Sequence, residues 1–325
     1  MIGYIFKRIS YAIPILIGVN ILTFSLFFMV NNPDQIARVH LGEKHVTKEA
    51  VELWKAAHGY DKPLFINHSE TGHHILTNTI FYEKSVKLFA FDFGRSDVGS
   101  DISHDVFQRM WPSLAIAVPA LLIGLLLNIT IAILIVFFRY SYLDTFGVIV
   151  CVMMMSISAL FYIVGGQFLL SNLLKWVPIS GYEHGVYMIK FLILPVLVGV
   201  VGGIGSGVRW YRTLFIEEIS RDYVRTARAK GLSEIAVLFR HVLRNALIPI
   251  LTGVVVILPL LFLGSLLTES FFGIPGLGSY TIDAINQQDF AIVRSMVFLG
   301  SVLYVLGLIL TDITYTWVDP RVRFK

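Results

Sequence analysis

The sequence predicts an all-α membrane protein with six transmembrane helices. Hydrophobic residues make up 56% of the 325 positions and charged residues only 15%, whereas a soluble domain carries about 25% charged residues. The charges are clustered, which leaves several uncharged runs long enough to cross a bilayer. Basic residues concentrate in short loops on one predicted side, so the positive-inside rule places both termini in the cytoplasm. The net charge of +4 therefore indicates membrane topology and not a nucleic-acid partner.

The first expected span occupies residues 1–30. Lys7 and Arg8 precede an apolar run that ends near Val30. No small-residue cleavage site follows, so we expect an uncleaved span and not a signal peptide. The other expected spans cover residues 111–138, 146–174, 187–208, 246–268 and 295–311.

Residues 31–110 form a polar region that we expect to be an extracytoplasmic loop domain, because long segments translocate largely regardless of charge. Residues 111–325 are expected to form the core membrane domain, which contains the other five spans. The loop contains seven of the nine histidines. Their spacings match no compact metal-ligand signature, so we expect solvent-exposed histidines and no metal site. Whether this loop docks a partner or only connects two spans stays open.

Residues 209–245 form a charged segment between two apolar runs, and we expect it to dock another protein. Apolar residues recur every four positions from Tyr211 to Ala227, which predicts an amphipathic helix. Gly231 is expected to end this helix in the left-handed conformation, and Ser233 to cap the next one. The alternative is an interfacial helix held on anionic lipid, but acids interleaved with the bases favour a protein partner.

Several motifs, in this order, resemble the membrane-spanning subunit of bacterial ATP-binding-cassette (ABC) importers of the oligopeptide/dipeptide/nickel family. The large loop after the first span is similar to that of the B-type permease. Arg225-Thr226-Ala227, three residues before Gly231, stands where the general family pattern has Glu-Ala-Ala; this replacement is common in the peptide-transporter branch. The motifs are Arg8 and Pro14 in the first span, Gly59–Leu64, Asp92–Ser96, Arg109–Leu114, Tyr223–Pro249, Glu269–Gly278 and Asp319–Arg321.

The resemblance implies a type I ABC importer permease in the bacterial inner (plasma) membrane. It implies four kinds of partner: a C-type sister permease, two ATP-binding subunits, an extracytoplasmic substrate-binding protein and membrane lipid. ATP and Mg²⁺ would be used by the ATP-binding subunits, with no cofactor bound by this chain. The sequence agrees, because it contains no Gly-x4-Gly-Lys-Ser/Thr phosphate-binding motif. We therefore expect a non-catalytic subunit.

Three groups of residues are candidates for function within this scheme. The expected ATPase-coupling residues are Glu217, Glu218, Asp222, Arg225, Thr226, Ala227, Arg228, Lys230 and Gly231. The expected binding-protein docking residues are Glu269, Gly273, Pro275, Gly276 and Gly278, with Pro275-Gly276 at the centre of a type II turn. The substrate-path candidates, each of which could instead make helix–helix hydrogen bonds, are Asn128, Ser156, Ser158, Tyr162 and Gln167.

Two other functional classes remain as alternatives. A stand-alone secondary transporter or channel would need charges at membrane depth or broken helices in two similar halves, and neither is evident in the sequence. An intramembrane enzyme would need a catalytic constellation within the spans, and we find none. The sequence does not identify the substrate, and it does not decide between a homodimeric and a heterodimeric permease pair.

Overall fold

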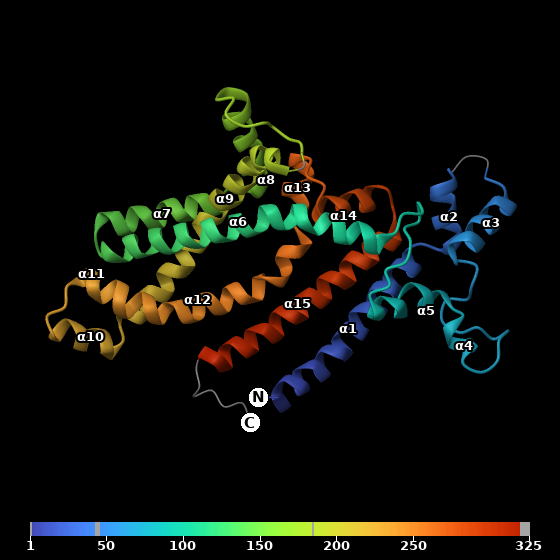
Figure 1. Ribbon diagram of the computed structural model, residues 1–325, viewed down its shortest axis with the longest axis horizontal. Helices are drawn as coiled ribbons and strands as arrows, with labels where there is room; N and C mark the ends of the chain where they lie inside the picture. The colour runs from blue at the N-terminus through green and yellow to red at the C-terminus, as the bar shows by residue number, and fades with distance from the viewer. Residues whose placement is uncertain (1, 43–45, 184, 319–325) are drawn as a thin grey trace. The chain divides into compact units, whose positions relative to one another are not determined.

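The computed structural model describes residues 2–42, 46–183 and 185–318, and within these ranges the chain is helical (Figure 1). The described part contains five helices long and apolar enough to span a membrane, or six if one bent helix pair is counted as a single span. The predicted all-α membrane class is therefore confirmed. The orientation of the termini stays a prediction. The Asp319–Arg321 motif and His45 lie outside the described residues.

Several spans are longer than the sequence predicts, because polar turns continue the apolar helices. The second begins at Ile102 and the fourth continues past Val208 to Ile219. The fifth ends at Leu263, earlier than expected, where Gly264 takes a positive φ of 69°. The span helices are α1 (Ile2–Val30), α6 (Ile102–Phe137), α9 (Met188–Ile219), α12 (Arg244–Ile257) and α15 (Phe290–Val318).

The third span is not one straight helix, which corrects the predicted single span over residues 146–174. Helix α7 (Tyr142–Ser156) meets the next helical stretch, residues 159–173, at 90°. This stretch comprises α8 (Ala159–Gly166) and a π-helical turn. The break occurs because Ile157 and Ser158 are extended, with Ser158 at the N-cap of α8. The Tyr162 hydroxyl donates to the Met154 carbonyl oxygen (2.8 Å), which satisfies a carbonyl near the interrupted end of α7.

The chain divides into two compact units. Within the described residues, unit 1 comprises residues 2–42, 46–110 and 280–309. Its aromatic core is formed by Phe24, Ile36, Tyr60 and Ile80, with Phe290 packed against them. Residues between the first two spans thus share a core with α1 and the start of α15. The short helices are α2 (Pro33–Leu41), α3 (Lys48–His58), α4 (His74–Thr77), α5 (Ile80–Lys84) and η1 (Val86–Ala90).

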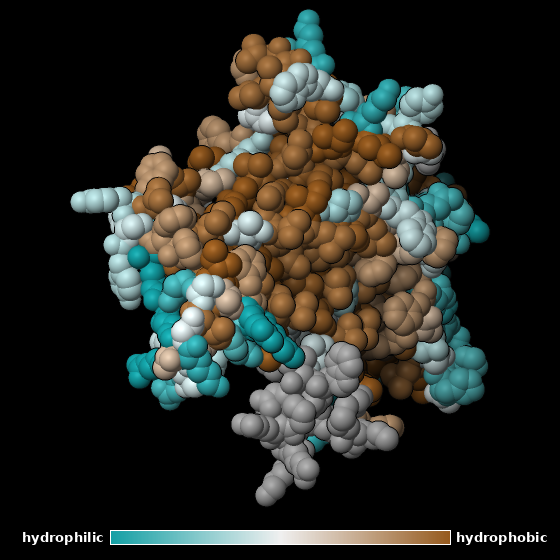
Figure 2. All heavy atoms as spheres, turned by 60° about the vertical axis from the view of Figure 1, so that its left-hand side comes forward, coloured by the Kyte–Doolittle hydropathy of each residue, from teal (hydrophilic) through white to brown (hydrophobic). Residues whose placement is uncertain are grey.

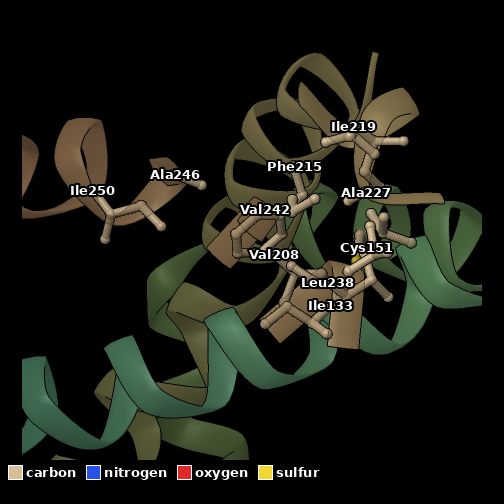
Figure 3. Close-up of a cluster of buried hydrophobic side chains, with 14 residues drawn as sticks. Ile133, Cys151, Val208, Phe215, Ile219, Ala227, Leu238, Val242, Ala246 and Ile250 are labelled. Carbon is tan, nitrogen blue, oxygen red and sulfur yellow. The ribbon is translucent and has the colours of Figure 1, made fainter. Parts of the chain in front are cut away.

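Within the described residues, unit 2 comprises residues 111–183, 185–279 and 310–318, and it contains two hydrophobic clusters. The larger cluster joins α6, α7, α9 and α12 to the charged segment 209–245 (Figure 3). Exposed apolar side chains, such as Leu126 and Phe146 at 67% and 65% exposure, lie on its membrane helices. Hydrophobic side chains also cover a broad area of the face shown in Figure 2, bordered by hydrophilic ones. Such a surface suits contact with lipid or with another membrane subunit.

Candidate functional site

The charged segment contains the predicted second helix after Ser233, but the predicted first helix is divided into two pieces. Helix α9 ends at Ile219, and α10 (Asp222–Ala229) begins after an extended Arg221. The Ser220 hydroxyl donates to the Glu217 carbonyl oxygen (2.7 Å), which competes with continuation of the helix. The predicted continuous helix from Tyr211 to Ala227 is therefore wrong.

The elbow after α10 agrees with the sequence. Lys230 is the C-cap, and Gly231 follows with φ +77°. The Leu232 N–H donates to the Ala227 carbonyl oxygen (3.4 Å) and closes the helix end. The Ser233 hydroxyl accepts from the Ala236 N–H (3.4 Å) and caps α11 (Glu234–Ala236). A π-helical turn, Val237–Leu243, then leads into α12.

The apolar face of α10 is buried within the chain itself. Val224 is 0% exposed and Ala227 4% exposed. Both belong to the same cluster as Cys151 of α7 and Phe215 of α9 (Figure 3). Ala227 therefore fixes α10 to the membrane helices, and this face is not available to a groove on a partner. The sequence could not distinguish these two uses of one apolar face.

The opposite side of α10 is polar and accessible. The side chains of Asp222 and Arg225 are 96% and 76% exposed, with a loose ion pair of 3.6 Å between them. Thr226, Lys230 and Gly231 are also exposed. These residues form the surface that another protein can contact without disturbing the core.

The remaining candidate charges are engaged in contacts within the chain. Arg228 binds Glu234 through two hydrogen bonds of 2.7 and 3.2 Å, which bridge the elbow. Glu217 pairs with Arg221 at 3.1 Å. Glu218 accepts a hydrogen bond from the Tyr223 hydroxyl. Burial and this carboxylate raise the pKa of Tyr223 to about 12.

One bidentate ion pair beside this surface was missed by the sequence reasoning. Arg212 of α9 donates to both carboxylate oxygens of Asp144 at the start of α7, at 2.9 and 3.0 Å. Asp144 is buried, at 8% exposure. The two residues are 68 positions apart. A lone acid in a basic turn was the available signal, but its partner depends on tertiary packing.

The second candidate segment is organised by Glu269 of α13 (Leu266–Phe272), which is 1% exposed. Its carboxylate accepts from the Ser265 and Ser279 N–H groups, both at 3.1 Å. The Ser113 hydroxyl accepts from the Leu277 N–H at 2.8 Å. An added Cβ at Gly276 would lie 2.2 Å from the Glu269 carboxylate, so only glycine fits there.

This geometry corrects two expectations about the Glu269–Gly278 segment. Gly276 donates its N–H to the Ile274 carbonyl oxygen (2.8 Å) and lacks a positive φ, so Pro275 is at the centre of a γ-turn and not within a type II turn. Glu269, Gly276 and Gly278 are buried, and only Gly273 and Pro275 of the five docking candidates are exposed. The first three residues therefore shape the loop, and the last two are accessible.

Some of the substrate-path candidates make contacts within the chain, and the others are exposed at the break of the third span. Asn128 is buried against Gly207, where an added Cβ would lie 2.4 Å from its Nδ2, so Asn128 mediates contact between α6 and α9. Gln167 donates to the Ile179 and Phe271 carbonyl oxygens at 3.2 and 3.1 Å. Ser156 and Ser158 are exposed at the break of the third span. Tyr162 supports this break through the bond to Met154 described above.

Within the described ranges, no group of three or more histidine, cysteine or acidic side chains could hold a metal ion. In the 31–110 region, His40 and His58 stack on Trp54, and the rings of His73 and His74 contact each other at a tilt.

The chain is similar to transport proteins over its whole length. A family model described as the binding-protein-dependent transport system inner membrane component matches residues 113–324, and a model of the N-terminal part of such membrane components matches residues 1–115. A putative peptide transport system permease protein of Brucella abortus is 33% identical over 330 residues, covering 100% of both chains.

Two proteins of Bacillus subtilis are similarly related. The dipeptide transport system permease protein DppB is 29% identical, covering 99% of this chain and 98% of that protein. The oligopeptide transport system permease protein AppB is also 29% identical, covering 100% of both chains.

Proposed function

This chain belongs to the inner membrane component family of binding-protein-dependent transport systems, and on that premise we propose that it is the B-type permease of an ABC importer for peptides. As a member of this family it is a non-catalytic, multi-pass permease subunit of the inner membrane, and it acts together with other transporter components. Peptides are proposed because the relatives with full-length similarity are described as peptide, dipeptide or oligopeptide permeases.

The complete importer would contain a C-type sister permease, two ATP-binding subunits and an extracytoplasmic binding protein. The ATP-binding subunits would use ATP and Mg²⁺, because this sequence contains no phosphate-binding loop of that type. Both termini and residues 209–245 would face the cytoplasm, and residues 31–110 the opposite side.

The observation that carries the coupling proposal is the two-sided character of α10. One face is locked into the core through Val224 and Ala227, while Asp222, Arg225 and Lys230 are accessible. An ATP-binding subunit that contacts the accessible face would therefore move α10 together with the membrane helices packed on its other face. The Arg228–Glu234 hydrogen bonds hold the elbow, so that displacement is transmitted and not absorbed by the Gly231 turn.

The experiment is a charge reversal on the accessible face. Arg225→Glu combined with Lys230→Glu should abolish co-purification of the ATP-binding subunits and ATP-driven uptake. Lys48→Glu is the matched control, because Lys48 is an exposed cation at the start of α3 in the 31–110 region. Unchanged co-purification of the double variant, at normal expression, would refute α10 as the contact.

The substrate path is proposed to run beside the break of the third span. Ser156 and Ser158 expose their hydroxyl groups there, and Gln167 is half-buried at the start of the π-helical turn that follows α8. Gly273 and Pro275 are the accessible residues proposed to contact the binding protein. Cysteine substitutions at Ser156 and Ser158 in a Cys151→Ser background should be protected from a thiol reagent by transported peptide. Equal labelling with and without peptide would place the path elsewhere.

A further inference from the structure

Unit 2 has an apolar groove of about 410 Å³ between the last turns of α6 and the turns that follow Gly231. Two of its lining residues, Ile133 and Leu238, are buried members of the larger hydrophobic cluster (Figure 3). Two others, Leu134 and Phe239, are more than half exposed. The α6 wall consists of Leu126, Ile129, Thr130, Ile133, Leu134, Phe137 and Phe138, and the opposite wall of Ile235, Leu238, Phe239 and Leu243.

The walls of this groove offer hydrocarbon and no available hydrogen-bonding side chain. Thr130 is the one polar residue among the described residues that line it, and its hydroxyl donates to the Leu126 carbonyl oxygen at 2.7 Å. A peptide or another polar ligand would leave its own polar groups unpaired there, which is costly. The occupant should therefore be apolar along the length of the groove.

The dimensions of the groove fit one narrow chain better than a helix. The α6 wall runs from Leu126 to Phe138, which is about 18 Å at the rise of an α-helix. Half of the hydrocarbon core of a bilayer is about 15 Å thick. The groove is thus about as long as one leaflet is deep. A helix about 10 Å across and equally long would occupy more than about 1,000 Å³, which exceeds the volume of the groove.

One end of the groove is positively charged. Arg139 directly follows Phe138 at this end and is half-buried. Its charge acts on the carboxylate of Glu234, the residue that precedes Ile235 of the opposite wall. That carboxylate already accepts two hydrogen bonds from Arg228, of 2.7 and 3.2 Å.

A second acid near this end also has an arginine of its own. Asp144 Oδ2 accepts a hydrogen bond from the Tyr140 N–H at 3.3 Å, and both carboxylate oxygens accept from Arg212. Arg139 is therefore the third cation beside two carboxylates. The positive-inside rule places this turn at the cytoplasmic surface, where anionic lipid headgroups attract basic residues.

We propose that the groove binds one acyl chain of an anionic phospholipid, whose phosphate group is held by Arg139. A guanidinium can bind a phosphate through paired N–H groups, and the apolar walls cover the acyl chain. Val224 and Ala227 of α10 belong to the same cluster as Ile133 and Leu238. The bound lipid would therefore support the packing that fixes α10 to the membrane helices, whatever the transported substrate is.

The test is native mass spectrometry of the purified full chain in detergent, titrated with phosphatidylglycerol or with phosphatidylcholine of the same acyl chains. Phosphatidylglycerol should fill one site about 10-fold more tightly, because phosphatidylcholine carries a cation beside its phosphate. Arg139→Gln should remove this preference, and Arg139→Lys, which keeps the charge, should retain most of it. Lys7→Gln removes an exposed cation near the start of α1 and should leave the preference unchanged.

A matched pair of substitutions on α6 tests the apolar part of the site. Leu134→Trp places an indole in the groove and should abolish binding at this site. Leu122→Trp changes a similarly exposed leucine that does not line the groove, and it should leave binding intact. The thermal midpoint of each variant checks its folding, and the Arg139 variants decide if Leu134→Trp does not fold.

Several results would overturn the lipid site. They are equal affinity for the two lipids, an unchanged preference in Arg139→Gln, or undiminished binding by Leu134→Trp. Loss of the bound lipid when the sister permease is co-expressed would assign the groove to a protein interface and would also overturn the proposal.

Discussion

The Asp144–Arg212 ion pair provides a quantitative test of how the charged segment is fixed to the membrane helices. Asp144→Asn and Arg212→Gln, alone and combined, remove one or both charges and keep a polar side chain at each position. The pair joins the start of α7 to α9 through hydrogen bonds of 2.9 and 3.0 Å. Its side chains are only 12% and 24% exposed.

The burial of this pair sets the expected magnitude. Exposed ion pairs contribute about 0–1 kcal/mol, and breaking a fully buried pair costs about 3–5 kcal/mol. This pair is bidentate and mostly buried, so each single substitution should lower the free energy of unfolding by about 2–3 kcal/mol. The double substitution should cost little more than either single one, because no unpaired charge remains.

The assay is a double-mutant cycle on the free energy of unfolding in a fixed detergent. The Asp222–Arg225 pair of α10 is the control, since its side chains are 96% and 76% exposed and its closest approach is 3.6 Å. Asp222→Asn and Arg225→Gln should show no measurable coupling. Additive costs at Asp144 and Arg212 would show that the two residues do not act as a pair, which would refute the reasoning.

Two further predictions concern special positions in the two candidate segments. Gly231→Val should reduce ATP-driven uptake while leaving expression intact, because φ is +77° and a branched residue there costs roughly 1–2 kcal/mol. No atom lies within 4 Å of an added Cβ, so Gly231→Asn should retain more uptake than valine, and equal uptake by both would contradict this reading. Burial raises the pKa of the Glu269 carboxyl, against smaller lowering contributions from Ser113 and backbone N–H groups. Its stabilising contribution is therefore complete below the unfolded-state pKa and is lost as pH rises through the folded-state pKa. Glu269→Gln should reduce the pH dependence of the thermal midpoint between those two pKa values. If the variant shows the same pH dependence as the original protein, the pKa shift is contradicted.

The fold class followed directly from composition and from uncharged runs, because a bilayer leaves few structural choices. The elbow at Gly231 could be predicted equally well from the sequence, because Gly231 and Ser233 have conformational preferences that act locally. Helix ends were less accurate. Residues 102–110 and 209–219 extend the span helices beyond their apolar parts. Hydropathy marks the end of an apolar segment and does not mark the end of its helix.

The features that the sequence did not reveal all depend on distant contacts. The third span contains no proline or charge at Ile157–Ser158 that would mark a break. Glu269 follows an apolar run and resembled an exposed loop acid, although its partners include Ser113 on another helix.

The interrupted third span restricts what can surround this subunit in the bilayer. Extended residues at 157–158 interrupt the run of helical hydrogen bonds, and hydrocarbon cannot replace those bonds. This stretch of backbone must therefore be covered by protein or reached by water. In a lone subunit surrounded by lipid, the backbone groups at the break would lack hydrogen-bond partners, which is costly. The break therefore favours assembly with a second membrane subunit that covers it.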